Sequence, residues 1–368
     1  MKAMAFVESE GSWRPTFLAR LKASRLFGPL AHAIGLTLVL AVGTLLPAVK
    51  LFPTPASYLP LHTMLESVAI VVSAMVFTLG WSLRQRDSDS HTVLLGVAAL
   101  CVLLIDLAHT LSYQGMPAFV TPSGPEKAIH FWLAGRLITA LTFITVSFSP
   151  PRHWSSRAYP LALASSLALA GLVWWIGLFH EDWLPRTFIP KQGLTTFKIV
   201  LEYILAALYG TAAIRLMWPG RKPGKVDADW LAAAAWTLAL AELFLTQYRD
   251  VTDLFNLLGH IYKALAYLMI YRAIFVAGVA APYRALRESE QRLNDAMTAS
   301  GEALWDWHID SNLVYHNARW CQKLGLDESL LSHPFAGFAE RVHEADRAAV
   351  MARIQACQEG KVFAPVEF

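Results

Sequence analysis

The sequence is dominated by long apolar runs that are separated by short polar gaps. Eight of these runs approach the roughly 20 mainly apolar residues that an α-helix needs to cross a bilayer. They are Leu30–Leu51, Leu61–Leu83, Thr92–Tyr113, Ala128–Phe148, Ala158–Phe179, Thr195–Trp218, Trp230–Tyr248 and Leu257–Ala280, of which the seventh is the shortest. The pattern therefore predicts an α-helical membrane protein built on an eight-helix transmembrane bundle.

Composition divides the chain into a membrane part and a water-soluble part. Charged residues make up 16% of the chain, compared with about 25% in soluble proteins, and the deficit ends near Ser289. We expect a cytoplasmic lead-in over residues 1–29, a membrane domain over 30–281, a helical linker over 282–298 and a soluble domain over 299–368. The net charge of +3 and the lack of a Lys/Arg-rich run give no indication of a nucleic-acid partner. Cys101, Cys321 and Cys357 are too far apart to suggest a disulfide framework.

The basic residues of the loops favour one orientation in the membrane. Cytoplasmic loops of membrane proteins carry an excess of Lys and Arg. Alternate gaps place Arg14, Arg20, Lys22, Arg25, Arg84, Arg86, Arg152, Arg157, Arg221, Lys222, Lys225, Arg284 and Arg287 on one side, against Lys50, Lys127, Arg186, Lys191 and Arg249 on the other. We therefore predict a multi-pass protein with both termini in the cytoplasm.

Ionisable side chains inside the apolar runs mark the candidate functional site. Such groups are costly within a membrane and are usually functional. They are His62, Glu66, Asp106, His109, Arg136, Glu202, Glu242, His260 and Lys263. With a rise of about 1.5 Å per residue, all nine map to the outer half of the bundle, and His62 falls in the first turn of its run.

The residue types leave several kinds of site open. His62 with Glu66 and Asp106 with His109 share helix faces and could supply four ligands to a transition metal. Two histidines could instead hold a haem, or the basic groups could hold a small anionic ligand. Arg136, Glu202, Glu242, His260 and Lys263 would then act as ligand-binding counter-charges, and Met116 would cover the outer end of the site. A structural polar network and a proton- or ion-conducting path are the remaining alternatives.

Residues after the last apolar run predict a linker helix and a small mixed domain. Leu286 and Leu293 are one heptad apart, which suits either a short parallel coiled coil in a homodimer or a solvated monomeric helix. Residues 303–309 and 313–316 alternate like strands, and 318–323 and 346–358 read as helices. Val362–Phe368 begins a further strand whose neighbour is missing, so we expect a truncated domain.

Several ordered motifs resemble the MASE3 membrane-associated sensor domain over roughly Leu30 to Tyr283. The motifs are Leu61-His62-Thr-Met-Leu-Glu66, Asp106-Leu-Ala-His109, Tyr113-Gln-Gly115-Met116, Trp132-Leu-Ala-Gly-Arg136 and Gly259-His260-Ile-Tyr-Lys263. The resemblance implies a sensory module of the bacterial inner membrane. It also implies an output, such as a histidine kinase or a diguanylate cyclase, that acts further along the signalling protein.

The soluble region is similar to a PAS domain. The resemblance is carried by Glu290-Gln-Arg-Leu, Trp305-Asp-Trp307, Asn317-Ala-Arg-Trp320 and Val342-His343-Glu-Ala-Asp346. It implies an incomplete α/β PAS domain that relays a signal or pairs two chains, without a cofactor of its own.

Together these features predict a membrane receptor that binds a ligand, metal or haem and signals through the linker to the PAS domain. The residues contain no catalytic signature. The rivals are an ion- or solute-translocating protein that uses the same buried groups and a membrane enzyme with an outward metal site.

Overall fold

The computed structural model describes residues 27–46, 49–84, 89–189, 192–218, 226–248, 250–301 and 303–360. It consists of two compact units, Met1–Pro282 and Tyr283–Phe368, which are described separately. Most of the predicted lead-in, the expected strand Val362–Phe368 and several loop charges used for the orientation, such as those at 221–225, lie outside the described residues.

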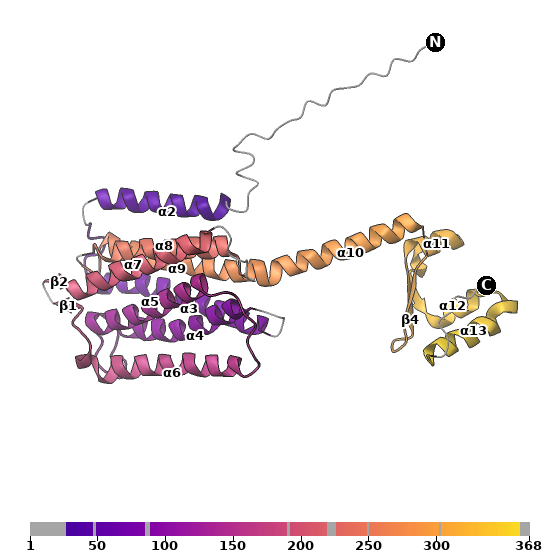
Figure 1. Ribbon diagram of the computed structural model, residues 1–368, viewed down its shortest axis with the longest axis horizontal. Coiled ribbons are helices and arrows are strands. Elements are labelled where there is room, and N and C mark those ends of the chain that lie inside the picture. The colour runs from indigo at the N-terminus through magenta and orange to yellow at the C-terminus, as the bar shows by residue number, and fades with distance from the viewer. Residues whose placement is uncertain are drawn as a thin grey trace, which may run out of the picture. The chain divides into compact units, whose positions relative to one another are not determined.

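Eight helices of the described N-terminal unit are long and apolar enough to cross a membrane, as the sequence predicts. They are α2 (Phe27–Leu45), α3 (Pro55–Leu83), α4 (Ser90–Leu111), α5 (Pro125–Phe148), α6 (Ala158–Phe179), α7 (Thr196–Met217), α8 (Ala228–Leu245) and α9 (Leu254–Phe275). Figure 1 shows them aligned as one bundle. The protein is therefore a membrane-associated multi-helix protein.

Polar caps, and not apolarity alone, set where the helices begin. The α3 helix starts six residues before the predicted Leu61, because Thr54 and Ser57 form a reciprocal capping box and Pro55 occupies the first turn. Asp253 caps α9 through the amide of Asn256, so that helix also starts earlier than predicted. At their other ends α2 and α8 stop at Leu45 and Leu245, short of the predicted Leu51 and Tyr248.

Non-sequential helices meet in the middle of the bundle. The α8 helix contacts α2, α7 and α9, while α3 contacts both α4 and α9, and α5 contacts α4 and α7. The α2 and α6 helices lie at opposite edges of the bundle (Figure 1), and they are the least buried of the eight helices. The α2 helix packs against α8, and α6 packs mainly against α4. This arrangement brings α3, α4, α5 and α9 around one buried volume.

The helix ends divide the bundle into a cap end and an exit end. The cap end is formed by the connections 49–54, 112–124, 180–195 and 246–253, including the hairpin β1 (Phe188–Ile189) and β2 (Gly193–Leu194). Backbone hydrogen bonds from Leu51 and Phe52 to Thr252 join two of these connections. At the exit end α9 continues through a π-turn, Val276–Ala280, into the helix α10 (Ala281–Ser300) without a break.

The C-terminal unit contains a small antiparallel sheet of order β3-β4-β5. Its elements are β3 (Trp305–His308), β4 (Leu313–His316), α11 (Ala318–Leu324), η3 (Glu328–Leu330), β5 (Ser332–Pro334), α12 (Phe335–Arg341) and α13 (Glu344–Gln358). Phe338, Val342 and Val350 form its hydrophobic core. The first two strands fall within the predicted strand segments, while the PAS assignment stays a prediction.

Candidate functional site

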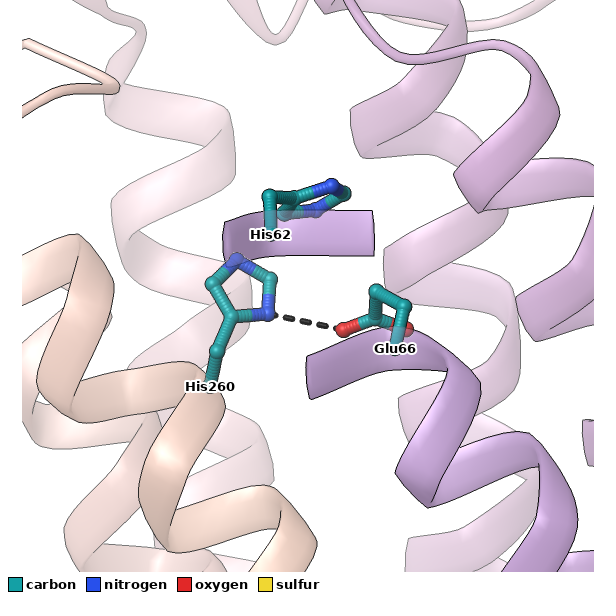
Figure 2. Close-up of side chains that lie close together, drawn as sticks. All are labelled: His62, Glu66 and His260. Carbon is teal, nitrogen blue, oxygen red and sulfur yellow. Dashed lines mark hydrogen bonds and ion pairs between the residues drawn. The ribbon is translucent and has the colours of Figure 1, made fainter. Parts of the chain in front are cut away.

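A buried carboxylate on α3 joins two side chains of α9. The Glu66 Oε1 atom lies 2.8 Å from Nδ1 of His260, and its Oε2 accepts a hydrogen bond of 2.6 Å from Nζ of Lys263. Figure 2 shows His260 and Glu66 facing each other across the two helices, with His62 above them. All three residues of this contact are at most 3% exposed. The pairing fixes the position of α9 against α3.

Asp106 on α4 extends the ionic contact to a third and a fourth helix. Its Oδ2 lies 3.0 Å from Nζ of Lys263 and 3.5 Å from an amino nitrogen of Arg136 on α5, and it accepts a hydrogen bond of 3.3 Å from Tyr267. Arg136 also donates to the Tyr267 hydroxyl. Two carboxylates and two cations therefore alternate, which is what permits charge to be buried here.

Trp132 lies beside both cations of this network. The Lys263 nitrogen is 4.7 Å from the centre of the indole ring, and the guanidinium carbon of Arg136 is 4.9 Å from it. Both distances are within the range of cation–π attraction. Trp132, one turn before Arg136 on α5, thus adds an aromatic face to the ionic network.

Two histidines next to the network have ring nitrogens without a hydrogen-bond partner. Both nitrogens of His62 and the Nε2 of His109 are buried and unpartnered among the described residues. The His62 ring stacks on Tyr113 with 3.7 Å between ring centres and stands 4.8 Å from the ring of His260. The His109 ring is 5.3 Å from that of His62, and its Nδ1 lies 2.8 Å from the carbonyl oxygen of Ala128.

A second buried cluster lies on α7 and α8. The Lys198 nitrogen forms an ion pair of 2.5 Å with Glu202, donates to the Leu245 carbonyl, and lies 4.3 Å from the centre of the Tyr248 ring. Among the residues that the structure describes, neither carboxyl oxygen of Glu242 has a hydrogen-bond partner, although this side chain is fully buried. The sequence analysis missed Lys198, which its spacing of four residues from Glu202 could have revealed.

A cavity of about 30 Å³ connects the two clusters. It is lined by His109, His260, Trp132, Lys198 and Glu202, among others. A space of this size holds one or two water molecules or an ion.

Outside the membrane spans, the cap end is tied together by charge. Burial raises the pKa of the Glu181 carboxyl, although His130 lies 3.8 Å away. For Asp250 the burial effect is outweighed by hydrogen bonds from Thr252 and by Lys50, so its pKa is lowered. The Lys50–Asp250 pair joins two connections of the cap end, and the His130–Glu181 contact joins a third connection to α5.

The residues that lie close together in the structure differ from the predicted set of metal ligands. The ligand atoms of His62, Glu66 and His260 lie within 4.8 Å of one another; Asp106 instead contacts Lys263, Arg136 and Tyr267. Because α3 begins at Pro55, His62 lies about 10 Å into the helix and not in its first turn. Met116 packs with Tyr58 and Tyr113 in an apolar cluster of the cap end.

Comparison with known proteins gives one match. The sequence model of a family described as a membrane-associated sensor domain, MASE3, matches residues 54–282. Neither the curated proteins nor the solved structures gave a match. The matched range begins just before α3 and ends just after the π-turn, so it includes every residue of the buried cluster. Because the match covers more than half of the chain, this protein belongs to the MASE3 family of membrane-associated sensor domains.

Proposed function

We propose that the chain is an integral membrane sensory receptor whose signal is received at the buried network of Glu66, Asp106, Arg136, His260 and Lys263. One observation carries the proposal: two members of the site, His260 and Lys263, lie on α9 with their neighbour Tyr267, and α9 continues through the π-turn into α10. A change in the site therefore acts on the same helical segment that leaves the membrane domain.

Transmission requires a ligand that binds one helix arrangement more strongly than another. The α9 side chains are bound to α3 through Glu66 and to α4 through Asp106. A ligand that competes for either carboxylate alters those bonds and shifts α9 relative to its neighbours. The π-turn supports this role, because such turns are frequent at functional sites.

The remaining parts of the proposal concern the surroundings of the site. The bilayer of the bacterial cytoplasmic membrane surrounds the bundle, with both termini in the cytoplasm. The C-terminal unit acts as a PAS relay to a histidine kinase or diguanylate cyclase output. Leu286 and Leu293 on α10 are exposed and one heptad apart, which supports a homodimer that pairs through this helix.

The size of the cavity favours a small ligand. A space of about 30 Å³ is far below the volume of a haem macrocycle, and the neighbouring His62 ring is stacked on Tyr113. The residues present therefore do not fit a haem in this arrangement. An ion or a ligand of very few atoms fits.

The ion-translocating alternative has less support from the geometry. Away from the cap end, buried Thr139 and Thr237 donate to carbonyl oxygens of their own helices, Gly135 and Ala233. Hydroxyls bonded in this way do not extend the ionic network toward the exit end. The cluster has the arrangement of an enclosed site.

Hydrogen–deuterium exchange on the full chain in lipid nanodiscs tests the proposal. Replacing Lys263 with Met removes the α9 charge and is expected to change exchange of the amides at 276–300, because α9 loses its bonds to α3 and α4. Lys198→Met removes an equally buried lysine from α7 and should leave this segment unchanged. Equal exchange in all three proteins would contradict the relay through α9.

A further inference from the structure

We infer that the signal received at this site is a divalent transition metal ion of the zinc type, bound by His62, Glu66 and His260 with His109 as the fourth donor. The inference rests on the proposed function only for its signalling consequence, because ion binding itself needs only the geometry of these side chains. It also revises the predicted ligand set: His260 replaces Asp106.

The unpartnered histidines are the first argument. A buried polar group without a hydrogen bond is costly, and among the described residues neither ring nitrogen of His62 has a partner. The Nδ1 of His109 faces a carbonyl oxygen, which only accepts, so in the neutral ring Nδ1 carries the proton and the unpartnered Nε2 has a free lone pair. Both rings therefore present metal-binding nitrogens to the same buried region.

Distances between the donor atoms are the second argument. Zinc binds nitrogen and oxygen at about 2.0–2.2 Å in a tetrahedral arrangement, so two ligand atoms on one ion lie about 3.3–3.6 Å apart. The donor atoms of His62, Glu66 and His260 lie within 4.8 Å of one another before any ion is bound. Side-chain rotations that bring these atoms about 1–1.5 Å closer together complete the coordination. A small cavity borders this group on the side of His109 and His260.

Residues behind the donors hold them in place. The second oxygen of Glu66 stays bonded to Lys263, and the carbonyl of Ala128 orients the ring of His109. Carboxylates and histidines that bind metals commonly have such outer partners, which fix their orientation and tautomer. The site thus has ligands from α3, α4 and α9 and supports from α5 and α9.

The donor type identifies the class of ion. Imidazole and carboxylate donors suit zinc and neighbouring divalent ions, whereas Cu(I) prefers sulfur, and the donor group contains no cysteine.

The consequence for signalling follows from the helices involved. An ion shared by His62, Glu66 and His260 clamps α9 to α3, in place of the present His260–Glu66 contact. Because α9 and α10 form one helical segment, the clamp acts on the linker.

Metal binding to the purified full-length chain tests the inference. After chelator treatment, Zn²⁺ is added, excess ion is removed by dialysis, and bound zinc is measured by elemental analysis. Co²⁺ then serves as a spectroscopic probe, since four-coordinate Co²⁺ absorbs visible light. We expect one equivalent per chain in the wild type.

We expect loss of that equivalent in His62→Phe and Glu66→Gln, which keep side-chain shape but remove donors. His130→Ala, at a buried histidine bonded to Pro185 outside the cluster, should retain it.

The outcomes separate this inference from the proposed function. Absence of stoichiometric zinc, or zinc retained in folded His62→Phe and Glu66→Gln, overturns the metal site, while an exchange change at 276–300 in Lys263→Met would still support the relay. Zinc that binds through these residues without altering exchange at 276–300 supports the metal site and removes the relay. Circular dichroism and gel filtration establish that each variant is folded.

Discussion

At the scale of residues, Lys263 is the side chain on which most buried contacts depend. Its nitrogen contacts two carboxylates, Glu66 and Asp106, and lies over the Trp132 ring. Removing one partner of a buried ion pair costs about 3–5 kcal/mol, because the remaining charge is left uncompensated in a medium of low polarity. By contrast, the Lys50–Asp250 pair of the cap end spans 3.7 Å and is about half exposed, and such pairs contribute roughly 0–1 kcal/mol.

We therefore expect Lys263→Met to lower the thermal unfolding temperature of the detergent-solubilised protein far more than Lys50→Met. The double variant Lys263→Met with Glu66→Gln should recover part of the loss, since one of the two uncompensated carboxylates is then neutral. Thermal unfolding followed by intrinsic tryptophan fluorescence measures all four proteins. Equal shifts for the two single lysine variants would show that the buried pairing contributes no more than a surface pair.

A second residue pair gives the C-terminal unit a dependence on pH. The Nε2 atoms of His316 on β4 and His333 on β5 lie 3.0 Å apart, and the His316 ring stacks on Trp320. Burial, followed by the nearby His333 and Arg341, lowers the pKa of His316 to about 4. The unfolded chain, with an ordinary histidine pKa of about 6.5, then binds more protons than the folded unit between these values. Stability is thus fully present above pH 6.5 and falls as the pH drops toward about 4.

The expected result is faster amide exchange in residues 305–360 at pH 5 than at pH 7, after correction for the intrinsic rate. His316→Phe, which keeps the stacking on Trp320, should reduce this difference. His308→Phe, on the exposed face of β3, should not. A pH effect that is unchanged in His316→Phe would assign it to other groups.

At the scale of elements, α3 and α4 make close backbone contact at Gly80 and Gly96. A Cβ atom added at Gly80 would lie 2.8 Å from the carbonyl oxygen of Thr92 and 3.0 Å from the Cα of Gly96. Small residues permit such approach between membrane helices. Any larger side chain separates the two helices, because the opposing atoms are backbone and cannot move aside alone.

We expect Gly80→Ala to lower the unfolding temperature, and Gly80→Leu to lower it further and to weaken the Asp106–Lys263 contact. Gly210→Ala is the matched control, since nothing lies within 4 Å of a Cβ at that helical glycine. There alanine should be neutral or stabilising by up to about 1 kcal/mol. Thermal unfolding of the three variants checks this, and a Gly80→Ala protein as stable as Gly210→Ala would contradict close packing at this point.

At the scale of the whole molecule, the eight membrane-capable helices place the described start of α2 and the exit of α9 at one end of the bundle. The basic loop residues favour that end as the cytoplasmic one. Cys357 is an exposed cysteine of the C-terminal unit, while Cys101 and Cys321 are buried. The native chain therefore carries a suitable reporter of orientation.

In intact spheroplasts a membrane-impermeant maleimide should leave Cys357 unlabelled until the membrane is permeabilised. A cysteine placed at exposed Ala118 in the connection 112–124 of the cap end, in a Cys357→Ser background, should be labelled without permeabilisation. The reverse labelling pattern would invert the orientation and place the candidate site toward the cytoplasm.

The number of spans and the depth of the ionisable residues along them could be predicted from the sequence, because hydropathy and helical rise are local properties. Eight apolar runs became eight helices, with bounds displaced where caps such as Thr54 and Asp253 begin a helix. Which of those residues meet depends on how the helices pack. Rise along an axis gives depth, but not the direction in which a helix faces or the helix beside it.

The pairing of α3 with α9, which are far apart in the chain, joins Glu66 to His260 and Lys263. The same arrangement surrounds Asp106 with Lys263, Arg136 and Tyr267, so its carboxylate balances cations while the histidines keep free nitrogens. The ionic network beside the candidate metal site therefore forms only when α3, α4, α5 and α9 pack together. The physical reason is that burying charge in an apolar bundle requires opposite charges in contact, and only packing creates those contacts.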